Sequence, residues 1–65
     1  MFVILNGAMI HLAEPQTLAA LLVLIAPPPP FAVAHNEEIV LRGTYEARLI
    51  SPGDRIEIVH PTAGG

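Results

Sequence analysis

The stretch FVILNGAMIHL, residues 2–12, decides the fold of this chain. It opens with a short apolar run of strand-forming residues, and Asn6-Gly7 then supplies the positive φ angles that a two-residue type I′ turn requires. After the turn the side chains alternate between two faces of a strand, with Ile10 and Leu12 on one face and Met9 and His11 on the other. The stretch therefore predicts a β-hairpin at the start of the chain.

An amphipathic helix is predicted after the hairpin, because the spacing of apolar residues changes. Thr17 is suited to cap the N-terminus of this helix with its side-chain oxygen. Apolar residues then recur at i, i+3, i+4 and i+7, and they mark the face that packs in the core: Leu18, Leu21, Leu22 and Ile25. Val23 and Leu24 widen this stripe, so we expect the helix to be buried on more than one side.

Four prolines, Pro27 to Pro30, end the predicted helix and are expected to continue as extended polyproline. Such a tract can be a ligand for SH3 or WW domains. We favour instead a stiff connector that joins the helix to the next strand of the same small core.

The middle of the chain predicts one further strand and an irregular stretch. Residues 31–35, FAVAH, form the strand, and Asn36-Glu37-Glu38 form the turn after it. Residues 39–41 are short and apolar, and residues 45–49 predict irregular structure or a single helical turn.

The last strand is predicted from a turn and the alternation that follows it. Ser51-Pro52-Gly53-Asp54 places proline and glycine at the two central positions of a type II turn. In residues 55–59, RIEIV, Ile56 and Ile58 face inward and Glu57 faces outward. His60-Pro61 ends the strand, because proline has no N–H to donate to a neighbouring strand.

Together these elements predict an α+β fold of the ubiquitin-like β-grasp type, in which a mixed sheet wraps around one main helix. Its order is two strands, a helix, a strand, an irregular segment and a last strand. The first strand is almost entirely apolar, so we expect it inside the sheet and parallel to the last strand. We place the β-grasp domain at residues 1–60 and a flexible tail at residues 61–65, which ends in diglycine.

Composition narrows the possible functions of this chain of 65 residues. A net charge of −3, with Arg42, Arg48 and Arg55 as the only basic residues apart from histidine, argues against binding to nucleic acid. Cysteine is absent, which excludes disulfides, a cysteine-ligated zinc and thiol chemistry of the chain itself.

A membrane segment and a signal peptide are not expected either. The most hydrophobic stretch, residues 18–26, would span about 14 Å as a helix, against about 30 Å of bilayer hydrocarbon. No cation precedes this stretch, as one would in a signal peptide. We therefore expect a cytoplasmic protein.

Gly64-Gly65 at the end of the sequence points to chemistry at a C-terminal carboxylate. Glycine has no side chain, and its backbone reaches φ/ψ regions closed to other residues. Such an end can enter a narrow enzyme channel and present its α-carboxylate, whereas a disordered terminus is the simpler alternative.

The chain resembles the ThiS family, the sulfur carrier proteins of thiamine biosynthesis, over its whole length. The resemblance rests on Leu5-Asn6-Gly7, on Thr17-Leu18 with Leu21-Leu22, and on residues 33–36 with Glu38-Ile39-Val40. Its strongest part is the closing run GDRIEIVHP, residues 53–61, followed by Gly64-Gly65.

This resemblance implies a carrier rather than an enzyme, with no cofactor bound to the chain itself. An E1-like adenylyltransferase would use ATP to adenylate the carboxylate of Gly65, and Gly64 would allow that enzyme to approach the backbone closely. Sulfur from a cysteine-derived persulfide of a desulfurase system would displace AMP and leave a C-terminal thiocarboxylate, a 1-thioglycine. Thiazole synthase would then take this sulfur. The chain has no glycine-rich phosphate loop, so we expect ATP to bind the partner.

Two departures from the family pattern affect loops and leave the tail unchanged. The four prolines replace a stretch that is usually polar, and Asn36-Glu37-Glu38 stands where Asn-Gly-Glu is common. Because Glu resists positive φ, we expect this turn to change its type.

Other proteins share the tail, and these alternatives stay open. The small subunit of molybdopterin synthase has the same fold and diglycine but usually runs longer, and the Asn-Gly opening with the short length favours thiamine biosynthesis. Carriers for tRNA thiolation or cysteine synthesis have a tail of the same kind. An alternative of another class is a β-grasp interaction module that carries no sulfur.

A docking surface is expected on the side of the sheet that faces away from the helix. Met9 and Val59 point to that side, with Arg55 and Glu57 beside them. An apolar content of 52% also suggests that another protein covers part of the surface.

The remaining polar residues do not predict a metal or catalytic site. His11, His35 and His60 match no ligand spacing, and no thiol or carboxylate cluster supports them. The acidic pair Glu37-Glu38 is interpreted as solvated charge in a turn.

Overall fold

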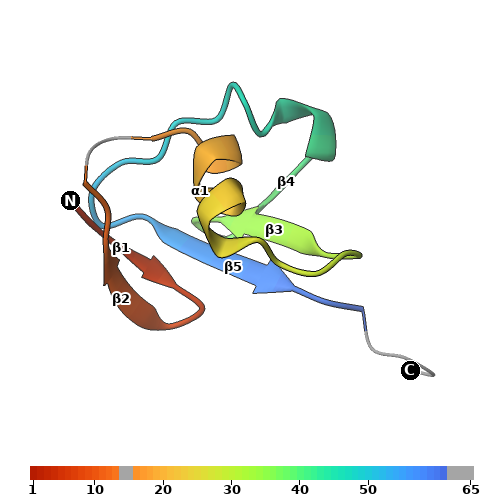
Figure 1. Cartoon of the computed structure of the whole chain (residues 1–65), viewed down its shortest axis with the longest axis horizontal. Coiled ribbons are helices and arrows are strands. Elements are labelled where there is room, and N and C mark those ends of the chain that lie inside the picture. The colour runs from red at the N-terminus through yellow and green to blue at the C-terminus, as the bar shows by residue number, and fades with distance from the viewer. Residues whose placement is uncertain (14–15, 62–65) are drawn as a thin grey trace.

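The computed structural model describes residues 1–13 and 16–61, and within them five strands form one mixed sheet with an α-helix against one face (Figure 1). The elements in chain order are β1 (Phe2–Leu5), β2 (Ala8–His11), α1 (Leu18–Ile25), β3 (Ala32–His35), β4 (Glu38–Val40), the 3₁₀ helix η1 (Arg42–Thr44) and β5 (Arg55–Val59). The predicted α+β fold of the β-grasp type is confirmed.

The N-terminal hairpin follows the prediction. Leu5 pairs with Ala8 across the turn, and Asn6 and Gly7 have φ angles of 48° and 83°, both positive as a type I′ turn requires. Leu12 is buried and Met9 is exposed, in agreement with the expected alternation. The hairpin is closed beyond β2 by a hydrogen bond of 2.7 Å from the Leu12 N–H to the Met1 carbonyl.

The strands are arranged in the order β2-β1-β5-β3-β4, so β1 lies inside the sheet and β5 at its centre. As predicted, β1 and β5 run parallel, with Ile4 opposite Arg55 and Leu5 opposite Ile56. The two edges of the sheet are β2 and β4.

The core lies between the sheet and α1. Thr17 caps the helix as predicted, because its Oγ1 accepts a hydrogen bond of 3.1 Å from the Ala20 N–H. The buried apolar side chains come from both layers and from the loops that close them: Val3, Leu12, Leu18, Leu21, Leu22, Val33, Val40, Ile50 and Ile56.

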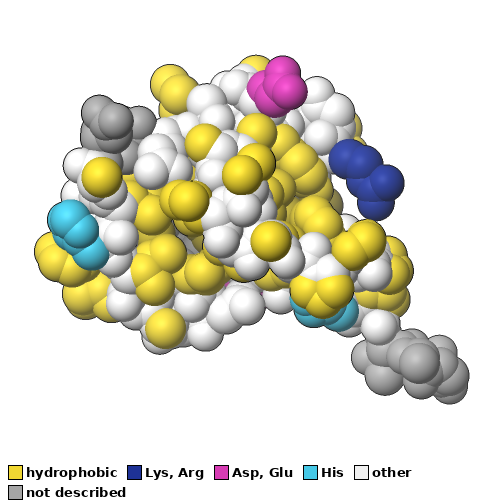
Figure 2. Space-filling model, in the orientation of Figure 1, with side chains coloured by type: hydrophobic (Ala, Val, Ile, Leu, Met, Phe, Trp, Pro, Cys, Tyr) yellow, Lys and Arg dark blue, Asp and Glu magenta, His cyan; other side chains and the backbone are white. Residues whose placement is uncertain are grey.

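The outer side of α1 is exposed, so the expectation of burial on more than one side was wrong. Val23 and Leu24 are 79% and 66% exposed. Each residue turns the helix by about 100°, which places the side chains of Val23 and Leu24 about 150° and about 110° from the middle of the buried stripe that faces the sheet. No second layer covers them within the described residues, and Figure 2 shows hydrophobic side chains at the surface on the side of the molecule that α1 covers.

The strand β4 was missing from the predicted order, which had four strands. Its three residues are too few to show an alternation, and it forms by pairing with β3, in which Val33 lies opposite Val40. β3 itself begins at Ala32, one residue later than predicted.

The turn between β3 and β4 does not change its type as expected. Asn36 and Glu37 have φ angles of 51° and 71°, the same signs as in the first hairpin turn. Tertiary contacts hold this geometry: Asn36 Oδ1 accepts from the Arg55 N–H at 2.8 Å, and the Glu37 carboxylate pairs with the Arg55 guanidinium.

The connector Pro27–Pro30 joins α1 to β3 as predicted, but the chain bends at Pro29 and Pro30, so the tract is not extended throughout. The helix ends before it at Ala26, whose φ of 49° is left-handed and whose N–H donates to the Leu22 carbonyl at 2.8 Å.

The segment from η1 to β5 completes the fold. After η1 the chain turns irregularly through residues 45–47, and Leu49 forms an isolated bridge with Thr17. The turn at residues 51–54 has Gly53 at φ 84° and a 3.1 Å hydrogen bond from the Asp54 N–H to the Ser51 carbonyl, as a type II turn requires. No helix in the described ranges 1–13 and 16–61 is long and apolar enough to cross a bilayer.

Candidate functional site

The two residues with which the sequence associates chemistry, Gly64 and Gly65, lie outside the described residues, as does the predicted tail beyond Pro61. The structure describes the chain up to the point where that tail begins. Here His60 Nδ1 lies 3.1 Å from the Pro30 carbonyl oxygen, which can only accept, so the imidazole donates this hydrogen bond. The His60 ring also contacts Phe31 edge to face, with centroids 6.5 Å apart. The proline connector therefore holds the chain where it leaves β5.

The four predicted docking residues all lie on the face of the sheet that is turned away from α1, which we call the outer face. On β5, Arg55, Glu57 and Val59 are exposed, whereas Ile56 between them is completely buried. Met9 lies opposite Ile4, and Ile4 lies opposite Arg55, so these three side chains form one row across the sheet.

The docking residues do not form a single cluster. Val59 lies at the other end of β5 from Arg55, opposite Ala32, and Glu57 lies between the two. At about 3.3 Å per residue, Arg55 and Val59 are about 13 Å apart along the strand. The outer face is therefore elongated, with apolar side chains near both ends.

Two exposed apolar residues of the outer face were missed by the sequence analysis. The Phe2 ring contacts the His11 ring edge to face, with the two ring centroids 5.0 Å apart. Because Phe2 directly precedes the buried Val3, the alternation along the strand could have predicted that Phe2 faces outward. Ile39 lies opposite Ala34, which in turn lies opposite Glu57. No signal for Ile39 existed, because β4 could not be assigned from its sequence.

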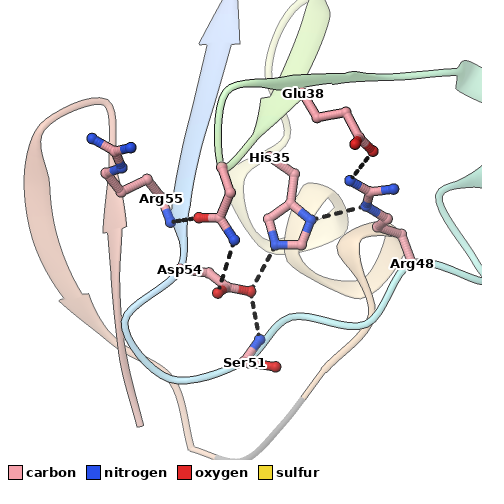
Figure 3. A network of polar contacts seen from close by, with 7 residues as sticks. His35, Glu38, Arg48, Ser51, Asp54 and Arg55 are labelled. Atoms are coloured by element: carbon pink, nitrogen blue, oxygen red, sulfur yellow. Dashed lines mark hydrogen bonds and ion pairs between the residues drawn. The ribbon is translucent and has the colours of Figure 1, made fainter.

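A polar network on the inner side of the sheet was also missed (Figure 3). His35 is only 7% exposed, and its Nε2 lies 2.7 Å from Asp54 Oδ2. Its Nδ1 accepts a hydrogen bond of 2.9 Å from Arg48 Nε, and Arg48 Nη2 donates to Glu38 Oε1 at 2.6 Å. A guanidinium can only donate, so Nδ1 is unprotonated and Nε2 carries the proton toward Asp54. The signal for this position was the alternation that places His35 on the same side as Val33.

Asp54 is the centre of the network. Its carboxylate accepts from the Ser51 N–H at 2.8 Å, from His35 and from Asn36 Nδ2 at 3.1 Å. Burial of the carboxylate opposes ionisation, but these hydrogen bonds together outweigh it and hold the pKa of Asp54 below its ordinary value. The network therefore joins the turn between β3 and β4, the turn before β5 and the loop that carries Arg48, and it ties the start of β5 to β3.

The three histidines lie in separate places. His11 is on the outer face, His35 is in the network and His60 is beside Pro30. Among the described side chains, no group of three His, Cys, Asp or Glu residues is arranged to hold a metal ion.

Comparisons with known proteins agree with this fold. The model of the ThiS family matches residues 3–65. Among solved structures, the chain is similar to the thiamine biosynthesis protein (ThiS) from Geobacter metallireducens, with a TM-score of 0.88 and 25% sequence identity over 100% of each chain. No curated protein matches the chain. Since the family model covers nearly every residue, the chain belongs to the ThiS family.

Proposed function

We propose that this protein is a sulfur carrier in thiamine biosynthesis and that the carboxylate of Gly65 carries the sulfur. The observation that supports this most is the family match, which extends over residues 3–65 and so includes Gly64-Gly65. The similarity to a solved thiamine biosynthesis protein over the full chain favours this pathway over molybdopterin synthesis.

The proposed reaction takes place on the chain but is catalysed by its partners. A carboxylate is a poor acyl donor, because oxide is a poor leaving group. An E1-like adenylyltransferase would therefore join the Gly65 carboxylate to AMP from ATP, with release of pyrophosphate. A persulfide of the desulfurase system would attack the acyl carbon and displace AMP, and a thiol would then cleave the S–S bond to leave the thiocarboxylate.

The chain contributes an acyl group, a backbone and a docking surface to this scheme. Because it contains no cysteine, the sulfur has no thiol of this chain on which to reside. Gly64 allows the close backbone approach that a narrow catalytic channel demands. Thiazole synthase is the proposed acceptor of the sulfur.

The outer face is the proposed docking surface for the adenylyltransferase. Met9, Val59, Phe2 and Ile39 are large, apolar and exposed, and such side chains supply most of the binding energy when an interface buries them. Arg55 and Glu57 lie among them and would set the orientation of the partner through charge.

Intact-mass measurement tests the proposed function. The protein is incubated with the adenylyltransferase, ATP and a sulfur source, and a carrier gains the mass difference between sulfur and oxygen on its C-terminal peptide. A matched variant with one alanine added after Gly65 should fold equally well and gain no mass. Modification of the extended variant, or no modification of the unaltered chain, overturns the proposal and favours an interaction module without sulfur.

A further inference from the structure

The edge strand β4 exposes backbone groups that no other part of the described chain uses. In a hairpin with a two-residue turn, the residues that flank the turn exchange hydrogen bonds, and the next pair does not. His35 and Glu38 flank the turn, so Ile39 directs its N–H and its carbonyl away from β3. Neither group has a backbone partner elsewhere in residues 1–13 and 16–61.

A hollow of about 380 Å³ lies beside this edge, on the side of the turn that follows η1. Its lining consists of residues of β4 and of the following loop: Glu38, Ile39, Val40, Leu41, Thr44, Ala47 and Arg48. Ile39 and Leu41 are 67% and 72% exposed. A free strand edge beside a hollow matches the requirements for strand addition, in which backbone bonds give affinity and the hollow selects a side chain.

A positively charged side chain, that of Arg42, also lies beside this edge. Arg48 pairs with Glu38 and Arg55 pairs with Glu37, whereas Arg42 makes no ion pair within the described part of the chain. Arg42 directly follows Leu41 and is exposed. The edge therefore has a positive charge at one end that a carboxylate of a partner can neutralise.

The register places this edge at the end of the sheet from which the tail continues. Val40 lies opposite Val33, and Val33 lies opposite Ile58, one residue before the end of β5. Two strand spacings, about 10 Å, separate Val40 from Ile58. A protein that receives the chain beyond β5 is therefore close enough to contact β4 as well.

We propose that β4 is a strand-addition site for the E1-like adenylyltransferase. An extended segment of that enzyme pairs with β4 through the N–H and carbonyl of Ile39. The segment places an apolar side chain in the hollow beside Leu41 and a carboxylate near Arg42. This inference rests on the proposed function, because it takes the enzyme that activates Gly65 as the partner.

Removal of one backbone donor tests the proposal directly. The 65-residue chain is made by chemical synthesis with an ester in place of the Ile39 amide, which removes its N–H and keeps the side chain. The matched control carries the same ester at His11 on the other edge, where the register also directs the N–H away from the neighbouring strand and the side chain is not one of the proposed docking residues. Circular dichroism reports whether both esters fold, and calorimetry with the purified adenylyltransferase gives the dissociation constant.

The Ile39 ester should bind roughly two- to tenfold more weakly than the unaltered chain, the range for one hydrogen bond, whereas the His11 ester should bind normally. The variant Arg42→Glu should also bind the adenylyltransferase more weakly than the unaltered chain, whereas Arg42→Lys should retain most of the affinity. The strand-addition site is overturned if the Ile39 ester binds the adenylyltransferase as tightly as the unaltered chain does, or if both esters weaken this binding equally. It is also overturned if the Ile39 ester weakens binding to thiazole synthase alone. Failure of the enzyme to bind or modify the unaltered chain overturns the proposed function instead.

Discussion

The imidazole of His35 donates a hydrogen bond of 2.7 Å to the carboxylate of Asp54, and this bond joins β3 to the turn that begins β5. Both side chains are largely buried, at 9% and 16% exposure. Because β5 begins directly after this turn, the bond fixes where the central strand of the sheet starts.

Replacement of Asp54 by alanine should lower the free energy of unfolding by about 1–3 kcal/mol, because the Ser51 N–H, His35 and Asn36 lose their shared acceptor. Urea unfolding followed by circular dichroism measures this change. Glu57→Ala, an exposed residue of β5 outside the network, is the control and should change stability little. An unchanged urea midpoint for the Asp54 variant would contradict the role given to the network.

The stability of the protein should fall in acid in a way that depends on Asp54. Its folded pKa lies below the ordinary value of 3.8, so its contribution is fully present above that value and is lost as the pH falls through the folded pKa. Urea midpoints measured from neutral pH downward should therefore decline below about that value. Asp54→Asn should remove part of this decline, and identical pH profiles for the two proteins would refute the assignment.

Arg48 should determine the tautomer of His35. Its Nε–H occupies Nδ1, so ¹⁵N NMR of the unaltered protein should show a protonated Nε2 and an unprotonated Nδ1. Arg48→Ala should destabilise the fold by about 1 kcal/mol and release this preference. Arg48→Lys keeps the charge but not the planar group that contacts both His35 and Glu38. It should therefore recover little of the stability and of the tautomer preference that Arg48→Ala loses. A protonated Nδ1 in the unaltered protein would be inconsistent with the network.

The two sides of α1 should respond very differently to substitution. Leu21→Ala should cost about 2–5 kcal/mol, because it opens a cavity in the core. Val23→Thr and Leu24→Gln should each change stability by less than about 0.5 kcal/mol, since both positions are exposed. Thermal unfolding distinguishes these outcomes, and a large loss at position 23 or 24 would show that this side of the helix is covered.

Charge on the outer face should impair docking and leave the fold intact. Met9→Glu and Val59→Glu should each lower kcat/KM for thiocarboxylate formation by roughly tenfold, the effect of losing an apolar contact worth about 1.4 kcal/mol. Ala20→Glu, at an exposed position of α1 on the other side of the molecule, is the control. If all three variants behave alike, the outer face is not the docking surface.

Several elements could be predicted from the sequence because their information is local. The Asn6-Gly7 turn, the Thr17 cap and the alternation in residues 55–59 each depend on a few neighbouring residues, and the structure confirms all three. The apolar character of β1 was also sufficient to predict its parallel neighbour β5.

The tertiary structure decided what depends on residues far apart in the chain. β4 is too short to have a period and exists through its pairing with β3, and only that pairing places Ile39 on the outer face and exposes a free edge. Val23 and Leu24 are as apolar as Leu21, but one sheet can cover only one side of a helix. His35, Arg48 and Asp54 show no spacing that would relate them, and they meet because the sheet and its loops bring their backbones together. The sequence by itself therefore determined the local elements, the fold class and the family resemblance. Which side chains are buried and which polar groups form hydrogen bonds could be learned only from the folded chain, because both depend on contacts between residues that are distant in the sequence.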